Sequence, residues 1–281
     1  MTRRKFLGTA GALAAGAAGV GAYTWRVEPH WVEVIRRDLP IRNLPEALQG
    51  RTLVQLSDLH IGNLVDPNYL IDCFQLVADL DPTFTVITGD FMSCRGPEQL
   101  GAVSGVMKHL KPGPLGAYAV LGNHDYALKW GDALTADRLC GRLADLGIEV
   151  LRNQARDVAG LTLVGLDDLW AGRFRPEEVM PGLDPKKPAL ALSHNPDTVD
   201  QPGWSDFRGW ILSGHTHGGQ CKPPFLPPPL LSVSNRRYTR GAFDLGDGRN
   251  LYINAALGYI RRVRFGVRPE ITAFRMIRSE A

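Results

Sequence analysis

The chain has 281 residues, of which 44% are hydrophobic and 22% charged, as in an ordinary globular protein with a sizeable core. Its net charge of +3 comes from the N-terminus, because residues 1–22 contain three basic and no acidic residues while the rest carries 29 of each sign. A broadly basic surface for nucleic acid is therefore excluded, which leaves only local basic patches.

Residues 1–25 are predicted to be a signal or a membrane anchor. Arg3, Arg4 and Lys5 precede an uncharged stretch, and the Arg-Arg pair followed by Phe-Leu resembles a twin-arginine signal. Glycine and alanine fill twelve of the twenty positions from 6 to 25, which favours the twin-arginine export machinery over ordinary secretion. A plain anchor with two chance arginines is the alternative. Cleavage after Ala22 and retention in the bilayer both remain open, so we expect a periplasmic or otherwise extracytoplasmic protein that is released or membrane-anchored.

From residue 31 to 281, short apolar runs alternate with helical stretches, which predicts one α/β domain. Six runs are apolar on both faces and are predicted as interior strands: Thr52–Leu56, Thr83–Thr88, Ala117–Leu121, Leu161–Leu166, Ala189–Leu192 and Trp210–Leu212. Three helices are predicted between them: one capped by Asp66 with Pro67 in its first turn, one over Pro97–Leu110 and one over Asp132–Leu146. After a proline-rich loop over Pro223–Pro229, strand-like stretches at Asn250–Asn254 and Ile271–Ile277 are expected to complete a second sheet.

Polar residues capable of metal binding follow five of the predicted strands directly. They occur in the motifs Asp58-Leu59-His60, Gly89-Asp90, Gly122-Asn123-His124-Asp125, Ser193-His194 and Gly214-His215-Thr216-His217, which hold five of the seven histidines. In open α/β sheets, ligands bind at this carboxyl edge. Because residues i and i+2 of an extended strand point the same way, we expect each of the pairs Asp58/His60 and His215/His217 to face one point. The neighbouring glycines are expected to allow tight turns: Gly89, Gly122, Gly214 and Gly218.

The candidate ligands are carboxylates, imidazoles and an amide: Asp58, His60, Asp90, Asn123, His194, His215 and His217. None of the four cysteines has CxxC spacing, so a thiolate site is not expected. The set suits Mn²⁺, Fe or Zn²⁺ better than Ca²⁺. Seven donors exceed what one tetrahedral ion needs and fit two ions roughly 3.5–4 Å apart. Each motif alone could be a turn or a structural zinc site, but the five together predict a two-metal centre.

The ordered string DxH, GD, GNHD, a lone His and GHTHGGQ over residues 53–220 resembles the calcineurin-like metallophosphoesterase family. The N-terminal signal, Ser57–Gly62 and Val263–Ile271 resemble its exported bacterial branch of YaeI/YkuE-type phosphodiesterases. The resemblance implies a four-layer α/β/β/α sandwich with the site at the strand ends. It also implies a metal-dependent phosphoric ester hydrolase acting on a small-molecule or lipid phosphoester.

The resemblance further implies a role for each site residue. One metal ion would be bound by Asp58, His60, Asp90 and His217, and the other by Asp90, Asn123, His194 and His215. Asp90 would bridge the two ions, and a hydroxide between them would attack phosphorus. His124 would stabilise the transition state or protonate the leaving oxygen, and Asp125 would orient His124.

Three functions remain open at this point. The leading one is a phosphodiesterase acting at the membrane or outside the cytoplasm. The second is a pyrophosphohydrolase that cleaves UDP-2,3-diacylglucosamine, as in lipid A synthesis, and the third is a non-catalytic metal-binding scaffold. Two groups of arginines could meet an anionic substrate or simply be solvated: Arg236, Arg237 and Arg240, and Arg261, Arg262 and Arg264.

Overall fold

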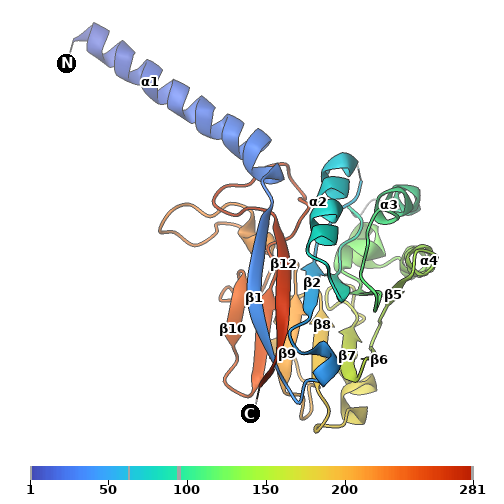
Figure 1. Cartoon of the computed structure of the whole chain (residues 1–281). Coiled ribbons are helices and arrows are strands. Elements are labelled where there is room, and N and C mark those ends of the chain that lie inside the picture. The colour runs from blue at the N-terminus through green and yellow to red at the C-terminus, as the bar shows by residue number, and fades with distance from the viewer. Residues whose placement is uncertain (1, 63, 94–95, 280–281) are drawn as a thin grey trace.

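The computed structural model describes residues 2–62, 64–93 and 96–279. In these ranges the chain forms two packed six-stranded sheets, with helices against one outer face and one long helix standing apart from the rest (Figure 1). The α-helices of the described ranges are α1 (Arg3–Ala22), α2 (Pro67–Asp79), α3 (Leu100–Met107) and α4 (Ala133–Ala144).

The strands of each sheet come largely from one half of the chain. The first sheet holds, in spatial order, β1 (Glu33–Arg42), β12 (Glu270–Ser279), β2 (Thr52–Leu56), β3 (Phe84–Thr88), β4 (Ala117–Val120) and β5 (Ile148–Val150). The second holds β10 (Gly241–Asp244), β11 (Arg249–Ile253), β9 (Gly209–Ser213), β8 (Ala189–Ser193), β7 (Leu161–Leu166) and β6 (Gln154–Val158). Strands β2 to β5 are parallel, as are β7, β8, β9 and β11.

Three apolar layers hold the domain together. Leu53 and Leu212 belong to a core between the two sheets, whereas Val54 lies in a second core between the first sheet and α2, α3 and α4. A third core covers the outer face of the second sheet, where short 3-10 helices such as Pro196–Asp200 replace longer helices. The predicted α/β/β/α sandwich is therefore confirmed, and its fourth layer is built from these short turns.

All six predicted interior strands are confirmed to within one residue at either end. The Asp66 side chain caps α2 as expected, accepting a hydrogen bond from the Asn68 N–H at 2.9 Å. The expected helix over Pro97–Leu110 is shorter, because its first turn is a 3-10 helix and the α-helix ends at Met107. Its two glycines, Gly101 and Gly105, weaken helical propensity.

The expected position of Ile271–Ile277 in the second sheet is wrong. These residues form β12, which lies in the first sheet, parallel to β1 and antiparallel to β2. Phe274 of β12 packs between the sheets and Ala273 packs toward the helices, so the strand is buried on both faces. Asn250–Asn254, by contrast, corresponds to β11 of the second sheet, as expected.

Helix α1 is the one helix in the described ranges that is long and apolar enough to cross a membrane. It continues through a π-helix over Tyr23–Val27 and a 3-10 turn over Glu28–His30, and none of its apolar stretch is buried against the domain. The chain then meets the domain at Glu28, a buried residue whose carboxylate accepts a hydrogen bond from the Val267 N–H at 2.9 Å. An apolar N-terminal helix of this kind is a signal or an anchor.

Candidate metal centre

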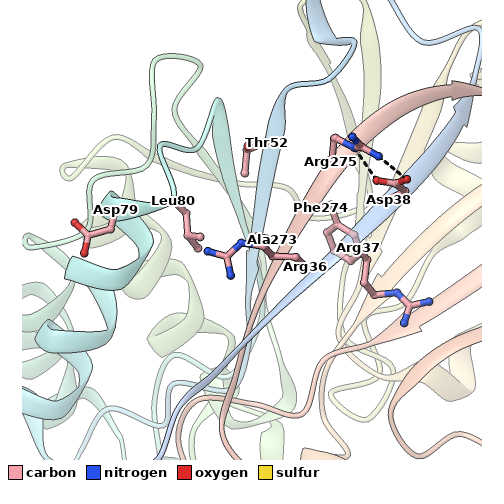
Figure 2. A pocket seen from close by; sticks show the side chains of 9 residues that line it. All are labelled: Arg36, Arg37, Asp38, Thr52, Asp79, Leu80, Ala273, Phe274 and Arg275. Carbon is pink, nitrogen blue, oxygen red and sulfur yellow. Dashed lines mark hydrogen bonds and ion pairs between the residues drawn. The ribbon is translucent and has the colours of Figure 1, made fainter.

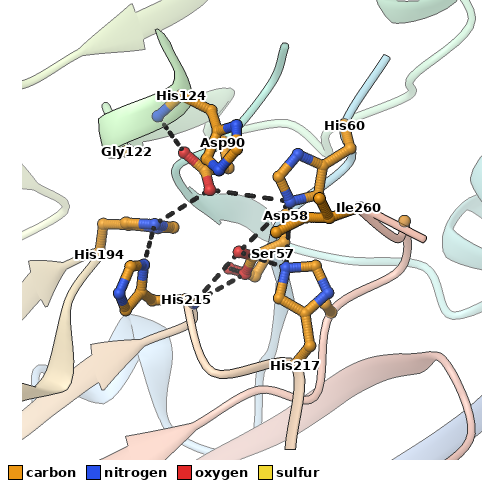
Figure 3. A network of polar contacts seen from close by, with 12 residues as sticks. Ser57, Asp58, His60, Asp90, Gly122, His124, His194, His215, His217 and Ile260 are labelled. Atoms are coloured by element: carbon orange, nitrogen blue, oxygen red, sulfur yellow. Dashed lines mark hydrogen bonds and ion pairs between the residues drawn. The ribbon is translucent and has the colours of Figure 1, made fainter. Parts of the chain in front are cut away.

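The site lies where the carboxyl ends of both sheets meet. In the first sheet, strand β2 leads into Asp58 and His60, and strand β3 leads into Asp90. Strand β4 leads into Asn123 and His124. Strands β8 and β9 of the second sheet lead into His194, His215 and His217. Figure 3 shows the labelled aspartates and histidines among them converging from the two sheets. The structure therefore brings together the residues that the sequence motifs singled out.

The backbone geometry at the site differs from the expected extended one. Asp58, His60, His215 and His217 all have positive φ, at 52°, 47°, 69° and 50°. This left-handed conformation is costly for residues other than glycine and is maintained only where the surroundings impose it. Asp58 and His60 nevertheless belong to one ligand group, as expected, whereas His215 and His217 belong to two different groups, so the expected i, i+2 rule is wrong for them.

The first group consists of Asp58, His60 and His217, all buried. The Nε2 atoms of the two histidines face each other at 3.0 Å, and that of His217 lies 3.2 Å from Asp58 Oδ1. The opposite nitrogen of His60 lies 3.2 Å from the carbonyl oxygen of Met92. A carbonyl there holds the proton on Nδ1 and leaves the Nε2 lone pair directed into the site.

The second group consists of Asp90, His194 and His215, which are also buried. His194 Nε2 lies 3.2 Å from Asp90 Oδ2 and 3.1 Å from His215 Nδ1, while its own Nδ1 lies 2.7 Å from the carbonyl oxygen of Thr88. The same Asp90 oxygen is 3.7 Å from His60 Nε2 of the first group. Asp90 therefore faces both groups, which is the geometry that a bridging ligand needs.

Asn123 supplies a test of whether a cation fits here. Its side chain is buried, yet neither its amide oxygen nor its amide nitrogen has a hydrogen-bond partner among the described residues. A buried polar group without a partner costs about 1–3 kcal/mol. Asn123 precedes His124, whose backbone N–H donates to Asp90 Oδ1, and an amide oxygen is a ligand type that a divalent ion accepts. The donor set and the unpaired amide both fit a metal centre.

Burial and the carboxylates set the protonation of the imidazoles. Burial lowers the pKa of His60 to about 3 and that of His215 to about 3, so both are neutral at physiological pH. For His194, burial acts in the same direction, but Asp90 and Asp58 outweigh it and hold the pKa well above its ordinary value. Burial would raise the pKa of Asp90, but His194 outweighs burial and holds that pKa well below the ordinary value. An ion at the second group must therefore displace a proton from His194.

His124 lies beside the first group. Its ring centroid is 4.9 Å from that of His60, and its backbone N–H donates to Asp90 Oδ1 at 2.9 Å. The expected contact between Asp125 and the His124 ring is not among the hydrogen bonds of the described residues. The Asp125 carboxylate instead accepts from the backbone N–H groups of Asp90, Gly122 and Met92 at 2.9–3.0 Å. Asp125 therefore fixes the loop that carries Asp90.

Glycine is required at the site mainly because neighbouring atoms leave no room for a Cβ. A Cβ at Gly122 would overlap Asp90 Oδ1, and one at Gly214 would overlap Ser57 Oγ. Neither of these two glycines has a positive φ, so the expected tight turn is not the reason for them. Gly89 and Gly218, which do have positive φ, agree with that expectation.

Sequence reasoning missed several residues around the centre. Ser57 donates a hydrogen bond to Asp58 Oδ2 at 2.5 Å. Trp170 places its ring 4.4 Å from that of His215 and stacks on Trp130 at 5.0 Å, which makes an aromatic wall beside the second group. The signal for Trp170 was its position just after Asp168, at the end of β7. Arg264, expected to meet a substrate or solvent, is buried and donates to four backbone carbonyls.

Two pockets bear on where a substrate enters. A groove of about 390 Å³ begins at His217 and is lined further out by apolar residues such as Leu230 and Ile260. A pocket of about 590 Å³ lies elsewhere, around Arg36 of β1 and the ion pair between Arg275 and Asp38 (Figure 2). None of the candidate ligands lines that second pocket, so the groove beside His217 is the one that bears on substrate entry.

Comparison with known proteins defines the class of enzyme. A model of the calcineurin-like phosphoesterase family matches residues 51–219, and the chain belongs to this family. Phosphodiesterase YaeI of Escherichia coli (strain K12) is 31% identical, covering 99% of this chain and 100% of YaeI. The uncharacterised metallophosphoesterase YkuE of Bacillus subtilis (strain 168) is 31% identical, with 98% and 97% covered. UDP-2,3-diacylglucosamine pyrophosphatase LpxG of Chlamydia trachomatis is 29% identical, with 93% and 94% covered.

Family membership and these relatives make the protein a phosphoester hydrolase. The idea of a non-catalytic scaffold is accordingly set aside. The two ligand groups indicate that divalent metal ions serve this hydrolase.

Proposed function

We propose that the protein is a two-metal phosphodiesterase that acts at the membrane or outside the cytoplasm. The observation that carries this proposal is the pair of buried three-residue groups, with one oxygen of Asp90 facing both. In the proposed assignment, the ligands of one ion are Asp58, His60, Asp90 and His217, and those of the other are Asp90, Asn123, His194 and His215. The donor types suit Mn²⁺, Zn²⁺ or Fe. Two such ions activate water at neutral pH and neutralise the charge of phosphoryl oxygens.

His124 is proposed as the residue that stabilises the transition state or protonates the leaving oxygen. Its ring is only half-buried and lies beside His60, and its buried Nδ1 has no hydrogen-bond partner among the described residues. Its backbone is fixed on Asp90. Asp125 acts indirectly in this proposal, as a positioning residue that holds the Asp90 loop and, through it, the His124 backbone.

Hydrolysis of a simple diester tests this function. Purified full-length protein, stripped of metal and reloaded with Mn²⁺, should hydrolyse bis(p-nitrophenyl) phosphate, and a chelator should abolish the reaction. The monoester p-nitrophenyl phosphate, assayed in parallel, reports the preference between diester and monoester. A preparation shown by elemental analysis to hold two ions per chain, yet inactive on both compounds, would overturn the proposal.

The proposal for where the protein acts in the cell rests on its N-terminal sequence. Residues 1–25 would be a twin-arginine-type signal or anchor, and residues 31–281 the phosphoesterase domain. The apolar α1 helix supports this division. Replacing Arg3 and Arg4 together by lysine should keep the protein in the cytoplasm, because the machinery reads the arginine pair. Export of this variant at the normal level would contradict the signal assignment.

A second candidate is a pyrophosphatase acting on UDP-2,3-diacylglucosamine. It is favoured by the similarity to LpxG and by the apolar groove that begins at His217. Incubation of the metal-loaded protein with this nucleotide lipid, followed by detection of UMP, separates the two candidates. Release of UMP at a rate well above that of diester hydrolysis would favour the pyrophosphatase.

A further inference from the structure

An exposed apolar loop lies next to the metal centre. It follows the GHTHGGQ motif and includes Phe225, Leu226 and Leu230, of which Phe225 is fully exposed and the two leucines are 60% and 69% exposed. Prolines occupy five positions between 223 and 229, so the loop has few N–H groups and little means of folding over its own side chains. Apolar side chains clustered in this way on a surface mark an interaction site.

A second loop, residues 257–268, continues the same surface. Ile260 and Val263 are exposed on it. The two loops are joined by backbone, because the Lys222 N–H donates to the Phe265 carbonyl at 2.7 Å. The Gln220 amide also donates to the carbonyl of Val263 at 2.9 Å. We call these two loops, residues 221–232 and 257–268, the apolar face.

The base of α1 rests on this face. The Arg264 N–H donates to the Thr24 carbonyl at 3.0 Å, and the Arg268 guanidinium lies 3.6 Å from the centre of the Trp31 ring. Figure 1 shows the same arrangement, with α1 leaving the domain at the end where the two loops project. Among the described residues, the one helix long and apolar enough to span a bilayer therefore joins the domain beside this exposed apolar loop.

The exposed charges of the two loops are basic, while the carboxylates of Glu28 and Glu33 line a pocket beside Phe265 and Arg268. Residues 1–27, 207–243 and 248–269 contain no aspartate or glutamate, although the chain as a whole carries 29 acidic residues. Lys222, Arg261 and Arg262 are exposed on the apolar face, and Arg26 is exposed at the base of α1. A protein partner is not defined by this pattern, whereas apolar tips surrounded by basic side chains match a bilayer with anionic headgroups.

We propose that the apolar face docks on the anionic lipid bilayer in which α1 is anchored. Phe225, Leu226 and Leu230 enter the headgroup and upper acyl region, while the arginines contact lipid phosphates. The domain is then held at two points, and the groove between Leu230, Ile260 and His217 opens toward the membrane surface. This proposal goes beyond the hydrolytic function, and it rests on the part of the proposed function in which α1 is kept as a membrane anchor.

Labelling from within the lipid tests the docking. Full-length protein is reconstituted into vesicles of phosphatidylethanolamine and phosphatidylglycerol that contain a phosphatidylcholine with a diazirine near the carbonyl end of one acyl chain. After illumination, mass spectrometry should find adducts both on α1 and on the peptide carrying Phe225 and Leu226. Adducts confined to α1 would overturn the proposal. So would equal labelling of α4, where Leu134 is 59% exposed on a different part of the domain.

Matched variants test which side chains and which lipids the loop labelling depends on. The double variant Phe225→Ser/Leu226→Ser should reduce adducts on the loop about tenfold, and the control Leu134→Ser should leave them unchanged. Both alter exposed side chains, and circular dichroism checks that each is folded. Replacing phosphatidylglycerol by phosphatidylcholine, or Arg261 and Arg262 by glutamine, should lower loop labelling severalfold. Loop labelling that is the same in all these conditions would contradict the proposal. Diester hydrolysis, measured on the unmodified protein, reports the proposed function separately.

Discussion

The two ligand groups of the centre contain the same kinds of side chain but differ in how ready they are to bind an ion. In the first group, His60 is neutral at physiological pH, because burial lowers its pKa to about 3. In the second, Asp90 keeps the pKa of His194 well above its ordinary value, against the effect of burial. Two ion sites that face one carboxylate can therefore differ in how strongly protons compete with the ion. The difference is set by which histidine lies closest to that carboxylate.

Asp90→Ala should have the largest effect, because one oxygen of this carboxylate lies near imidazoles of both groups. We expect both ions to be lost and diester hydrolysis to fall by more than about 10³-fold. Elemental analysis of the purified variant measures the ion content. Asp38→Ala, which breaks an exposed ion pair with Arg275, is the control and should keep both ions. An Asp90→Ala protein that still holds one ion would remove the bridging role.

His124→Ala should separate catalysis from metal binding. We expect turnover of bis(p-nitrophenyl) phosphate to fall by about 10²–10³-fold, because a positioned acid or hydrogen-bond donor is lost. Both ions should stay bound, since the His124 side chain is not in either ligand group. Steady-state kinetics together with elemental analysis checks both parts. Loss of an ion would instead make His124 a ligand.

Two single variants test the two ligand groups separately. His217→Ala should empty the first group and Asn123→Ala should weaken the second, each with loss of one ion and an activity decrease of about 10²-fold. Titration of the metal-free variants with Mn²⁺, followed by calorimetry, counts the sites that remain. If either variant lost both ions, the two groups would be a single cooperative site rather than two overlapping ones.

The smallest effect we predict is a difference in pH dependence. His194 has a raised pKa in the ion-free protein, so below that pKa an ion entering the second group must displace its proton. Affinity of the second ion should then fall about tenfold for each unit by which pH decreases below that pKa. His60 is neutral well above pH 3 and adds no such dependence to the first group. Calorimetric titrations at pH 6, 7 and 8 test this, and equal slopes for both ions would contradict it.

The parts of the fold that sequence predicted are those with local signals. Strand β3 could be found because Val86 and Ile87 are apolar and pack on opposite faces of the sheet. Strand β1 was missed, because its exposed Arg36 and Arg37 and its Pro40 give it no continuous apolar run. The partners of β12 depend on contacts with residues more than two hundred positions away, which no local pattern specifies.

The candidate site was more predictable than the strand order, for a physical reason. Histidines directly after apolar strands are rare by chance, and parallel strands bring such positions to one edge. The division of His215 and His217 between the groups was not derivable from extended-strand geometry, because neither residue has an extended backbone. The role of Asp125 was also out of reach, since its partners are backbone N–H groups of two loops rather than a side chain with a sequence signature.

The position of β12 has a consequence for biosynthesis. β1, the strand that follows the apolar helix, is hydrogen-bonded within its sheet to β12 alone, and β12 is the last strand of the described residues. Since synthesis proceeds from the N-terminus, β1 has no partner strand until residues 270–279 have left the ribosome. The first sheet therefore closes only after these residues have been made. A chain that stops short of β12 would leave its N-terminal helix attached to the domain without this strand pairing.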